Sequence, residues 1–252
     1  MKSLSTRAAV ATSIIAVLLA TAVARSAIPD EFARLVEVKG PGVFSILEEP
    51  TLFRVTELDG LPCSSEVFEF LIDRPRLAMV LGRALDPAMD AYEIRETGDG
   101  SYRVDDGGKL VGVVELVEDG RGRRIYYISG FWKFSLGLAL EGRMVLVPEY
   151  EESGDREGGR SVNTTTRGYM KVDNPLVGLL AKMVAHLFPG KVDGRINRFA
   201  DSVKKVAEAM RDDPVGLYRL LLASDQVTAA EADEFREMAL GGRLAGNPRK
   251  TS

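Results

Sequence analysis

Apolar and polar residues alternate through most of the chain between Tyr92 and Val172, and this alternation restricts the fold more than any other feature. The apolar side chains recur at even-numbered positions, including Tyr102, Val104, Val114, Leu116, Tyr126, Ile128, Met144, Leu146, Met170 and Val172. Side chains two residues apart on a strand lie on the same face. The pattern therefore predicts about six antiparallel strands in one curved sheet with an apolar face.

Glycine-containing turns are predicted between these strands. Gly98-Asp99-Gly100 is typical of a tight hairpin because aspartate and glycine tolerate positive φ, and Glu118-Asp119-Gly120 and Glu141-Gly142 are predicted turns of the same kind. The run from Tyr126 to Leu140 is too long for one straight strand of a small sheet. We therefore expect Gly130 or Gly137 to bend it.

Upstream of the sheet, the sequence predicts a short helix from Pro29 to Val36, which Gly40-Pro41-Gly42 ends. A β-rich segment from Leu52 to Leu58 is predicted to be an edge strand. Two short helices follow it, one capped by Ser64 or Ser65 and one from Pro75 to about Leu85.

Downstream of the sheet, Asn174-Pro175 is a strong helix start. Apolar residues at helical spacing then continue to Met210 with an interruption at Pro189-Gly190, which predicts one long kinked helix over the sheet. Two amphipathic helices, 215–223 and 229–240, follow as a hairpin, the second opened by Thr228 and Glu231 at capping-box spacing. The tail 241–252 is expected to be disordered.

The amino terminus predicts export. Lys2 and Arg7 precede an apolar run from Ala8 that ends in Ala22-Val23-Ala24, which is the pattern of a signal peptide over residues 1–24. The mature chain is then expected in the periplasm or secreted. The alternative is an uncleaved N-terminal membrane anchor, since the run is only slightly shorter than the roughly 20 residues that span a bilayer.

Composition excludes several functions. A net charge of −4 argues against nucleic acid as a partner. One histidine, His186, and one cysteine, Cys63, are a poor basis for a hydrolytic triad or a zinc site. Ser202-Val203-Lys204-Lys205 has Ser-x-x-Lys spacing without companion motifs. We therefore predict no catalytic residue, metal or cofactor, and Cys63 is expected to be a small buried apolar residue.

The order of these elements (a strand, two short helices, an antiparallel sheet and a long C-terminal helix) resembles the START-like helix-grip superfamily. This superfamily, also called SRPBCC, includes pollen-allergen, polyketide-cyclase and lipid-transfer domains. The resemblance covers about Thr51 to Met210. It implies an α+β fold with a curved antiparallel sheet of about seven strands wrapped on the C-terminal helix. The expected division is a signal peptide (1–24), an N-terminal extension (25–50), a START-like domain (51–211), a C-terminal helical hairpin (212–240) and a tail (241–252).

The resemblance also implies a hydrophobic cavity between sheet and helix, which predicts an exported protein that binds or transports a lipid or another hydrophobic small molecule. The expected ligand-binding residues combine an apolar lining with hydroxyl groups for a polar head: Tyr126, Trp132, Phe134, Leu136, Met144, Leu146, Tyr150, Thr164, Thr166, Met170, Leu180, Met183 and Phe199.

Two other functions stay open from the sequence. A cyclase- or hydrolase-type enzyme on the same fold needs an ionisable group in the cavity, for example a buried Asp, Glu or Arg near Trp132. An envelope assembly protein, with a membrane or envelope protein as partner, would use the Leu-rich segment from Leu217 to Leu222 as its docking surface.

Overall fold

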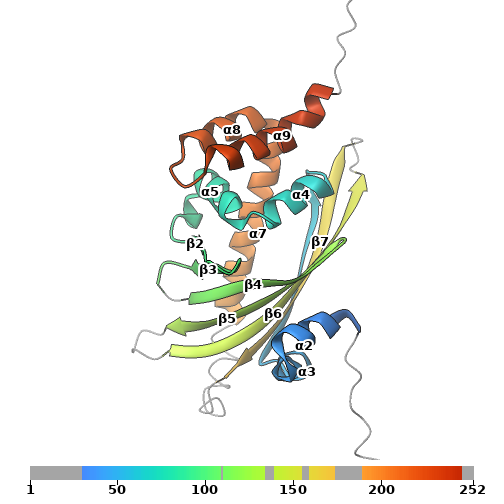
Figure 1. Ribbon diagram of the computed structural model, residues 1–252, viewed down its shortest axis with the longest axis vertical. Coiled ribbons are helices and arrows are strands. Elements are labelled where there is room, and N and C mark those ends of the chain that lie inside the picture. The colour runs from blue at the N-terminus through green and yellow to red at the C-terminus, as the bar shows by residue number, and fades with distance from the viewer. Residues whose placement is uncertain (1–29, 109, 134–138, 155–158, 174–188, 246–252) are drawn as a thin grey trace, which may run out of the picture.

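The computed structural model describes residues 30–108, 110–133, 139–154, 159–173 and 189–245. This part of the chain contains a seven-stranded antiparallel sheet in the order β1-β7-β6-β5-β4-β3-β2 (Figure 1). The strands are β1 (Leu52–Leu61), β2 (Glu93–Glu96), β3 (Tyr102–Asp105), β4 (Leu110–Gly120), β5 (Arg123–Lys133), β6 (Ala139–Gly154) and β7 (Arg160–Val172). The first strand therefore lies at an edge of the sheet, as predicted.

Helices precede, interrupt and follow the sheet. Before it come the 3-10 turns η1 (Asp30–Phe32) and η2 (Pro41–Val43) with α2 (Ala33–Lys39) and α3 (Phe44–Glu48). Between β1 and β2 lie α4 (Ser65–Ile72), α5 (Pro75–Leu85) and η3 (Pro87–Met89), and after β7 lie α7 (Pro189–Asp212), α8 (Pro214–Ala223) and α9 (Ala229–Ala245).

The predicted helix starts at Ser64 and Thr228 are confirmed. The Ser64 hydroxyl accepts a hydrogen bond from the backbone N–H of Val67 at the start of α4. Thr228 and Glu231 exchange side-chain and backbone hydrogen bonds in a full capping box. Both caps satisfy N–H groups that a helix start leaves without a partner.

The fold class is the predicted one. Two helices are inserted after the edge strand, the sheet is entirely antiparallel, and the long helix α7 follows the last strand. Figure 1 shows α4, α5, α8 and α9 gathered beyond one end of the strands. This is the helix-grip arrangement with an added C-terminal hairpin.

Two predicted turns are wrong. Glu118-Asp119-Gly120 belongs to β4, and the chain reverses at Arg121-Gly122, where Gly122 has a φ of 69°. Glu141-Gly142 lies inside β6. The run from Tyr126 to Leu140 is therefore not one bent strand, because β5 ends at Lys133 and β6 begins at Ala139.

A row of paired glycines explains why Gly142 is not in a turn. Gly112 pairs with Gly130 and Gly130 pairs with Gly142 across three neighbouring strands. A Cβ on Gly130 would lie 2.5 Å from the carbonyl oxygen of Val111. Glycine at this row lets adjacent strands approach more closely than a side chain would permit.

The expectation of one apolar face is also wrong. The odd face, which we define as the side carrying Ile125, Val145 and Val147, is fully buried at its centre, where each of these three side chains is 0% exposed. Phe32, Leu35, Val43 and Ile46 from the N-terminal helical segment share the same buried cluster. Figure 1 shows α2 and α3 lying against this part of the sheet. Residues 30–48 thus form the cover of the odd face.

A second buried cluster joins α4, α5 and α7 to the C-terminal hairpin. Leu217 and Leu221, from the Leu-rich segment considered as a docking surface, are buried within it, whereas Leu222 is 52% exposed. Most of this segment therefore packs against other helices of the same chain and is not available as a docking surface. Over the described ranges, no helix is both long and apolar enough to cross a membrane.

Candidate ligand-binding face

The opposite side of the sheet, the even face, carries the predicted ligand-binding residues of β6 and β7 together with Tyr126 of β5. Tyr126 pairs with Leu146, Ile128 pairs with Met144, and Met144 pairs with Met170. Residues directly opposite one another in a ladder share a face. The even face therefore presents a continuous apolar surface across β5, β6 and β7, to which Leu116 of β4 adds through its pairing with Tyr126.

The centre of the even face is less enclosed than the centre of the odd face around Val145. Tyr126, Ile128, Met144, Leu146 and Met170 are all half-buried, and Leu116 is 45% exposed. The part that is fully packed is one end, where Val203 and Ala207 of α7 and Phe68 of α4 share a cluster with Tyr150 and Val162. Apolar side chains left half-exposed in a contiguous set are typical of a binding surface.

The structure places the other predicted site residues differently. Tyr150 and Thr164 pair with each other and are buried at the packed end of the face, while Thr166 is half-buried beside Pro148. Phe199 on α7 is 55% exposed. The backbone of Trp132 pairs with Leu140. The Trp132 side chain, together with Phe134, Leu136, Leu180, Met183 and His186, lies outside the described residues.

Arg124 is a buried charged residue on the even face that the sequence analysis missed. Its side chain is only 5% exposed and contacts carboxylates from two elements, Asp73 at 3.2 Å and Asp119 at 2.8 Å. Its guanidinium also donates to the carbonyl oxygen of Gly120 at 2.6 Å and to the phenol oxygen of Tyr150 at 2.7 Å. We call Arg124, Tyr150, Asp73, Asp119 and Glu69 the Arg124 network.

Tyr150 extends this network to α4, because its hydroxyl donates to Glu69 at 2.9 Å. Burial, together with this hydrogen bond to a carboxylate, raises the pKa of Tyr150 above its ordinary value. Burial likewise raises the pKa of Tyr126 to about 12, and the nearby Asp73 carboxylate adds to this effect. Both phenols therefore remain protonated at neutral pH and can donate hydrogen bonds.

The Arg124 network does not provide the cavity acid or base that an enzyme would need near Trp132. Arg124 lies eight positions before Trp132 on β5, which is about 26 Å along a strand. Its donors are also occupied by protein acceptors. Among the described residues, no group of three or more His, Cys, Asp or Glu side chains is placed to hold a metal ion.

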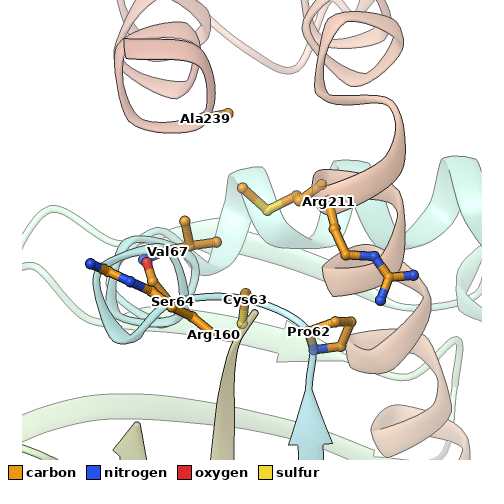
Figure 2. Close-up of a pocket in the computed structure, with 8 residues that line it drawn as sticks. Pro62, Cys63, Ser64, Val67, Arg160, Arg211 and Ala239 are labelled. Atoms are coloured by element: carbon orange, nitrogen blue, oxygen red, sulfur yellow. The ribbon is translucent and has the colours of Figure 1, made fainter. Parts of the chain in front are cut away.

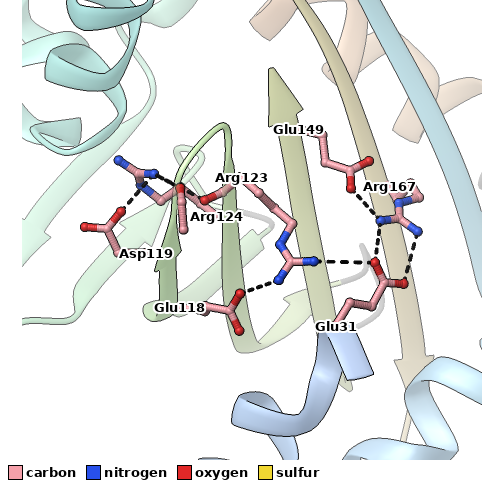
Figure 3. Close-up of polar contacts among 8 residues, drawn as sticks. Glu31, Glu118, Asp119, Arg123, Arg124, Glu149 and Arg167 are labelled. Carbon is pink, nitrogen blue, oxygen red and sulfur yellow. Dashed lines mark hydrogen bonds and ion pairs between the residues drawn. The ribbon is translucent and has the colours of Figure 1, made fainter. Parts of the chain in front are cut away.

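A separate ion-pair network lies on the odd side and joins the N-terminal segment to the strands (Figure 3). Glu31 contacts Arg167 at 3.1 Å and Arg123 at 3.6 Å. Arg167 also contacts Glu149 at 2.9 Å, and Arg123 contacts Glu118. These contacts connect η1 to the strands β4, β5, β6 and β7, so they fix the N-terminal cover in place.

A groove of about 400 Å³ lies away from both faces, where the end of α7 meets α4 and α9 (Figure 2). It is lined by Pro62, Cys63, Ser64, Val67, Arg160, Met210, Arg211 and Ala239. Burial raises the pKa of the Cys63 thiol to about 12. The thiol is therefore protonated and a poor nucleophile at neutral pH.

Comparison with known proteins shows no match to a family model and none to a curated protein sequence. Solved structures that resemble the chain include a conserved protein from Geobacillus kaustophilus, with 16% identity, a TM-score of 0.41 and coverage of 62% of this chain and 95% of that one. Ara h 8.0201 has 18% identity, a TM-score of 0.38 and coverage of 63% and 97%. A hypothetical protein from Helicobacter pylori has 14% identity, a TM-score of 0.38 and coverage of 65% and 92%. The helix-grip assignment accordingly rests on the strand order and helix positions of this chain.

Proposed function

We propose that this protein is an exported carrier or receptor that binds a lipid or another hydrophobic small molecule on the even face of its sheet, beneath the C-terminal helical region. The observation that supports this proposal is the difference between the two faces. Ile125, Val145 and Val147 are buried beneath residues 30–48, whereas the apolar side chains at the centre of the even face are only half-buried: Tyr126, Ile128, Met144, Leu146 and Met170.

The apolar side chains of this surface are suited to a hydrocarbon ligand. Each methylene that a ligand buries contributes roughly 0.8 kcal/mol, so an acyl chain of ordinary length gains several kcal/mol. Met144 and Met170 lie side by side at the centre of the face. Methionine side chains adjust to irregular apolar shapes, which suits a face that holds flexible chains.

The binding proposal is tested by purifying the protein, extracting it with organic solvent and analysing the extract by mass spectrometry. We expect a hydrophobic compound in the extract, and saturable binding of a neutral fluorescent apolar probe such as Nile red after delipidation. A clean extract together with no probe binding would contradict the proposal.

A matched pair of variants locates the binding surface. Leu116→Glu puts a charge on the even face, and Leu222→Glu puts the same charge on α8 at a leucine of similar exposure. Leu116→Glu is expected to weaken probe binding at least about tenfold, since a carboxylate would have to be desolvated by the bound probe. Equal binding by both variants would place the ligand elsewhere.

Export is tested independently of binding. Expression of the full chain with its N-terminal segment is expected to give a mature protein whose mass corresponds to cleavage after Ala24. An intact mass with membrane association would instead indicate the uncleaved anchor. Neither result affects the proposed binding face.

A further inference from the structure

The Arg124 network borders the apolar even face at one end. Arg124 and Tyr126 are two positions apart on β5, so both side chains leave the strand on the even side. Asp73, at the end of α4, contacts Arg124 and is close enough to Tyr126 to raise its pKa. A ligand that lies along the face with one end at Tyr126 would therefore meet this network.

Arg124 itself has little capacity left for a ligand. Its Nε donates to Asp73, one terminal nitrogen donates to Gly120 and Tyr150, and the other donates to the second oxygen of Asp73. Glu69 in turn accepts from Tyr150. The guanidinium is thus held by the protein and is not presented as an open anion site.

The charges of the network do not cancel. One positive group, Arg124, is surrounded by the carboxylates of Asp73, Asp119 and Glu69. The Arg124 network therefore carries an excess of negative charge and of hydrogen-bond acceptors. Tyr126 adds a phenol that is half-buried on the face.

We propose that this end of the even face, formed by Tyr126 and the Arg124 network, selects ligands whose polar head donates hydrogen bonds, and disfavours ligands with a carboxylate or phosphate head. The inference rests on the proposed function, because it assigns the head-group chemistry of the same site. An anionic head would be repelled by the excess carboxylates, and it could not donate to them. A hydroxyl or ammonium head can donate to Asp73 while its chain covers the apolar residues.

The test uses three ligands with the same twelve-carbon chain, namely dodecanol, dodecylamine and dodecanoate, in competition with Nile red on the full-length protein at pH 7.5 and low ionic strength. We expect dodecanol and dodecylamine to compete at least about tenfold better than dodecanoate. Added salt is expected to reduce the difference, because Asp73 and Asp119 are partly exposed to solvent.

Two variants assign the selection to named groups. Asp73→Asn is expected to improve dodecanoate binding several-fold, while Asp225→Asn, which removes an exposed carboxylate between α8 and α9, is expected to leave it unchanged. Tyr126→Phe is expected to weaken dodecanol binding several-fold more than it weakens Nile red binding. Thermal unfolding of each variant verifies that it is folded.

The outcomes separate this inference from the function that it rests on. If no ligand competes and Nile red does not bind, the proposed function fails. If dodecanoate competes as well as dodecanol, or if Asp73→Asn leaves the ratio unchanged, the function stands and the selectivity assigned to the Arg124 network is wrong. Preference for the amine over the alcohol would support the inference and narrow the ligand to a cation.

Discussion

Gly130 and Gly112 face each other across β5 and β4 so closely that a methyl group on Gly130 would lie 2.8 Å from the Cα of Gly112. That distance is below any normal carbon–carbon contact, and the obstructing atoms belong to the backbone. The neighbouring strand could not move aside without breaking its ladder. These glycines therefore set the separation of the strands at the centre of the sheet.

We predict that Gly130→Ala destabilises the protein by about 1–3 kcal/mol, because the added methyl group overpacks the contact between the strands. Chemical denaturation monitored by circular dichroism measures the change. Gly154→Ala is the control, because a Cβ at Gly154, in β6 of the same sheet, would meet nothing within 4 Å. Equal stability of the two variants would show that the strands tolerate a side chain at Gly130.

Removing the hydroxyl of Tyr150 is expected to be costly. In Tyr150→Phe, Arg124 loses a buried acceptor and Glu69 loses a donor, so the free energy of unfolding should fall by about 1–3 kcal/mol. The comparison is Tyr218→Phe, which removes an exposed hydroxyl that donates to Asp233 at 3.2 Å. A surface loss of this kind should change stability by less than about 0.5 kcal/mol.

The ion pairs of Glu31 are predicted to hold the N-terminal cover on the odd face. Glu31→Gln should lower stability by about 1 kcal/mol, since the glutamate contacts two arginines and all three side chains are mostly buried. Glu37→Gln, which breaks the exposed pair with Arg34, should have no measurable effect. A double-mutant cycle of Glu31 with Arg167 isolates the coupling, and a value of zero would contradict the prediction.

The thiol of Cys63 provides a pH-dependent prediction. Its pKa in the folded protein is raised from 9.0 to about 12, so folding favours the protonated thiol. The stability that this group contributes is complete below pH 9 and is lost as the pH rises from 9 towards 12. Unfolding measured across this range should therefore show a steeper alkaline loss in the wild type than in Cys63→Ala.

The burial of Cys63 also predicts that its thiol reacts slowly with thiol reagents. The folded protein should react with a thiol reagent at pH 8 far more slowly than the protein in denaturant, because the thiolate population and the access of the reagent are both low. The rate of absorbance increase measures this difference. Reaction of the folded protein at the rate of the denatured chain would show that the groove in Figure 2 exposes the sulfur.

Local signals in the sequence were sufficient to predict most helices and strands. Ser64, Pro75, Thr228 and the two-residue alternation placed helix starts and strands correctly, since caps and periodicity act over a few residues. The glycine signal was ambiguous, because Gly142 serves close strand packing instead of a turn. Nothing within β6 alone reveals that a glycine of β5 lies opposite.

The cover of the odd face was missed although a signal for it exists. Ile125 to Ile128 and Met144 to Val147 are continuous apolar runs, which are typical of strands buried on both faces. Arg124 was missed for another reason, because it stands between Arg123 and Ile125 next to a charged turn, and its burial depends on Asp73 from a distant helix.

Residues 30–48 cover the centre of the odd face, so the two faces of the same strands are under different constraints. The odd face contributes to stability, and the even face is proposed to contact the ligand. Under the proposed function, substitutions at Leu116, Ile128 or Met170 would alter which molecule the protein binds, while the hydrophobic cluster around Val145 continues to stabilise the fold. If the proposed function holds, ligand preference can therefore change during evolution without a prior gain in stability.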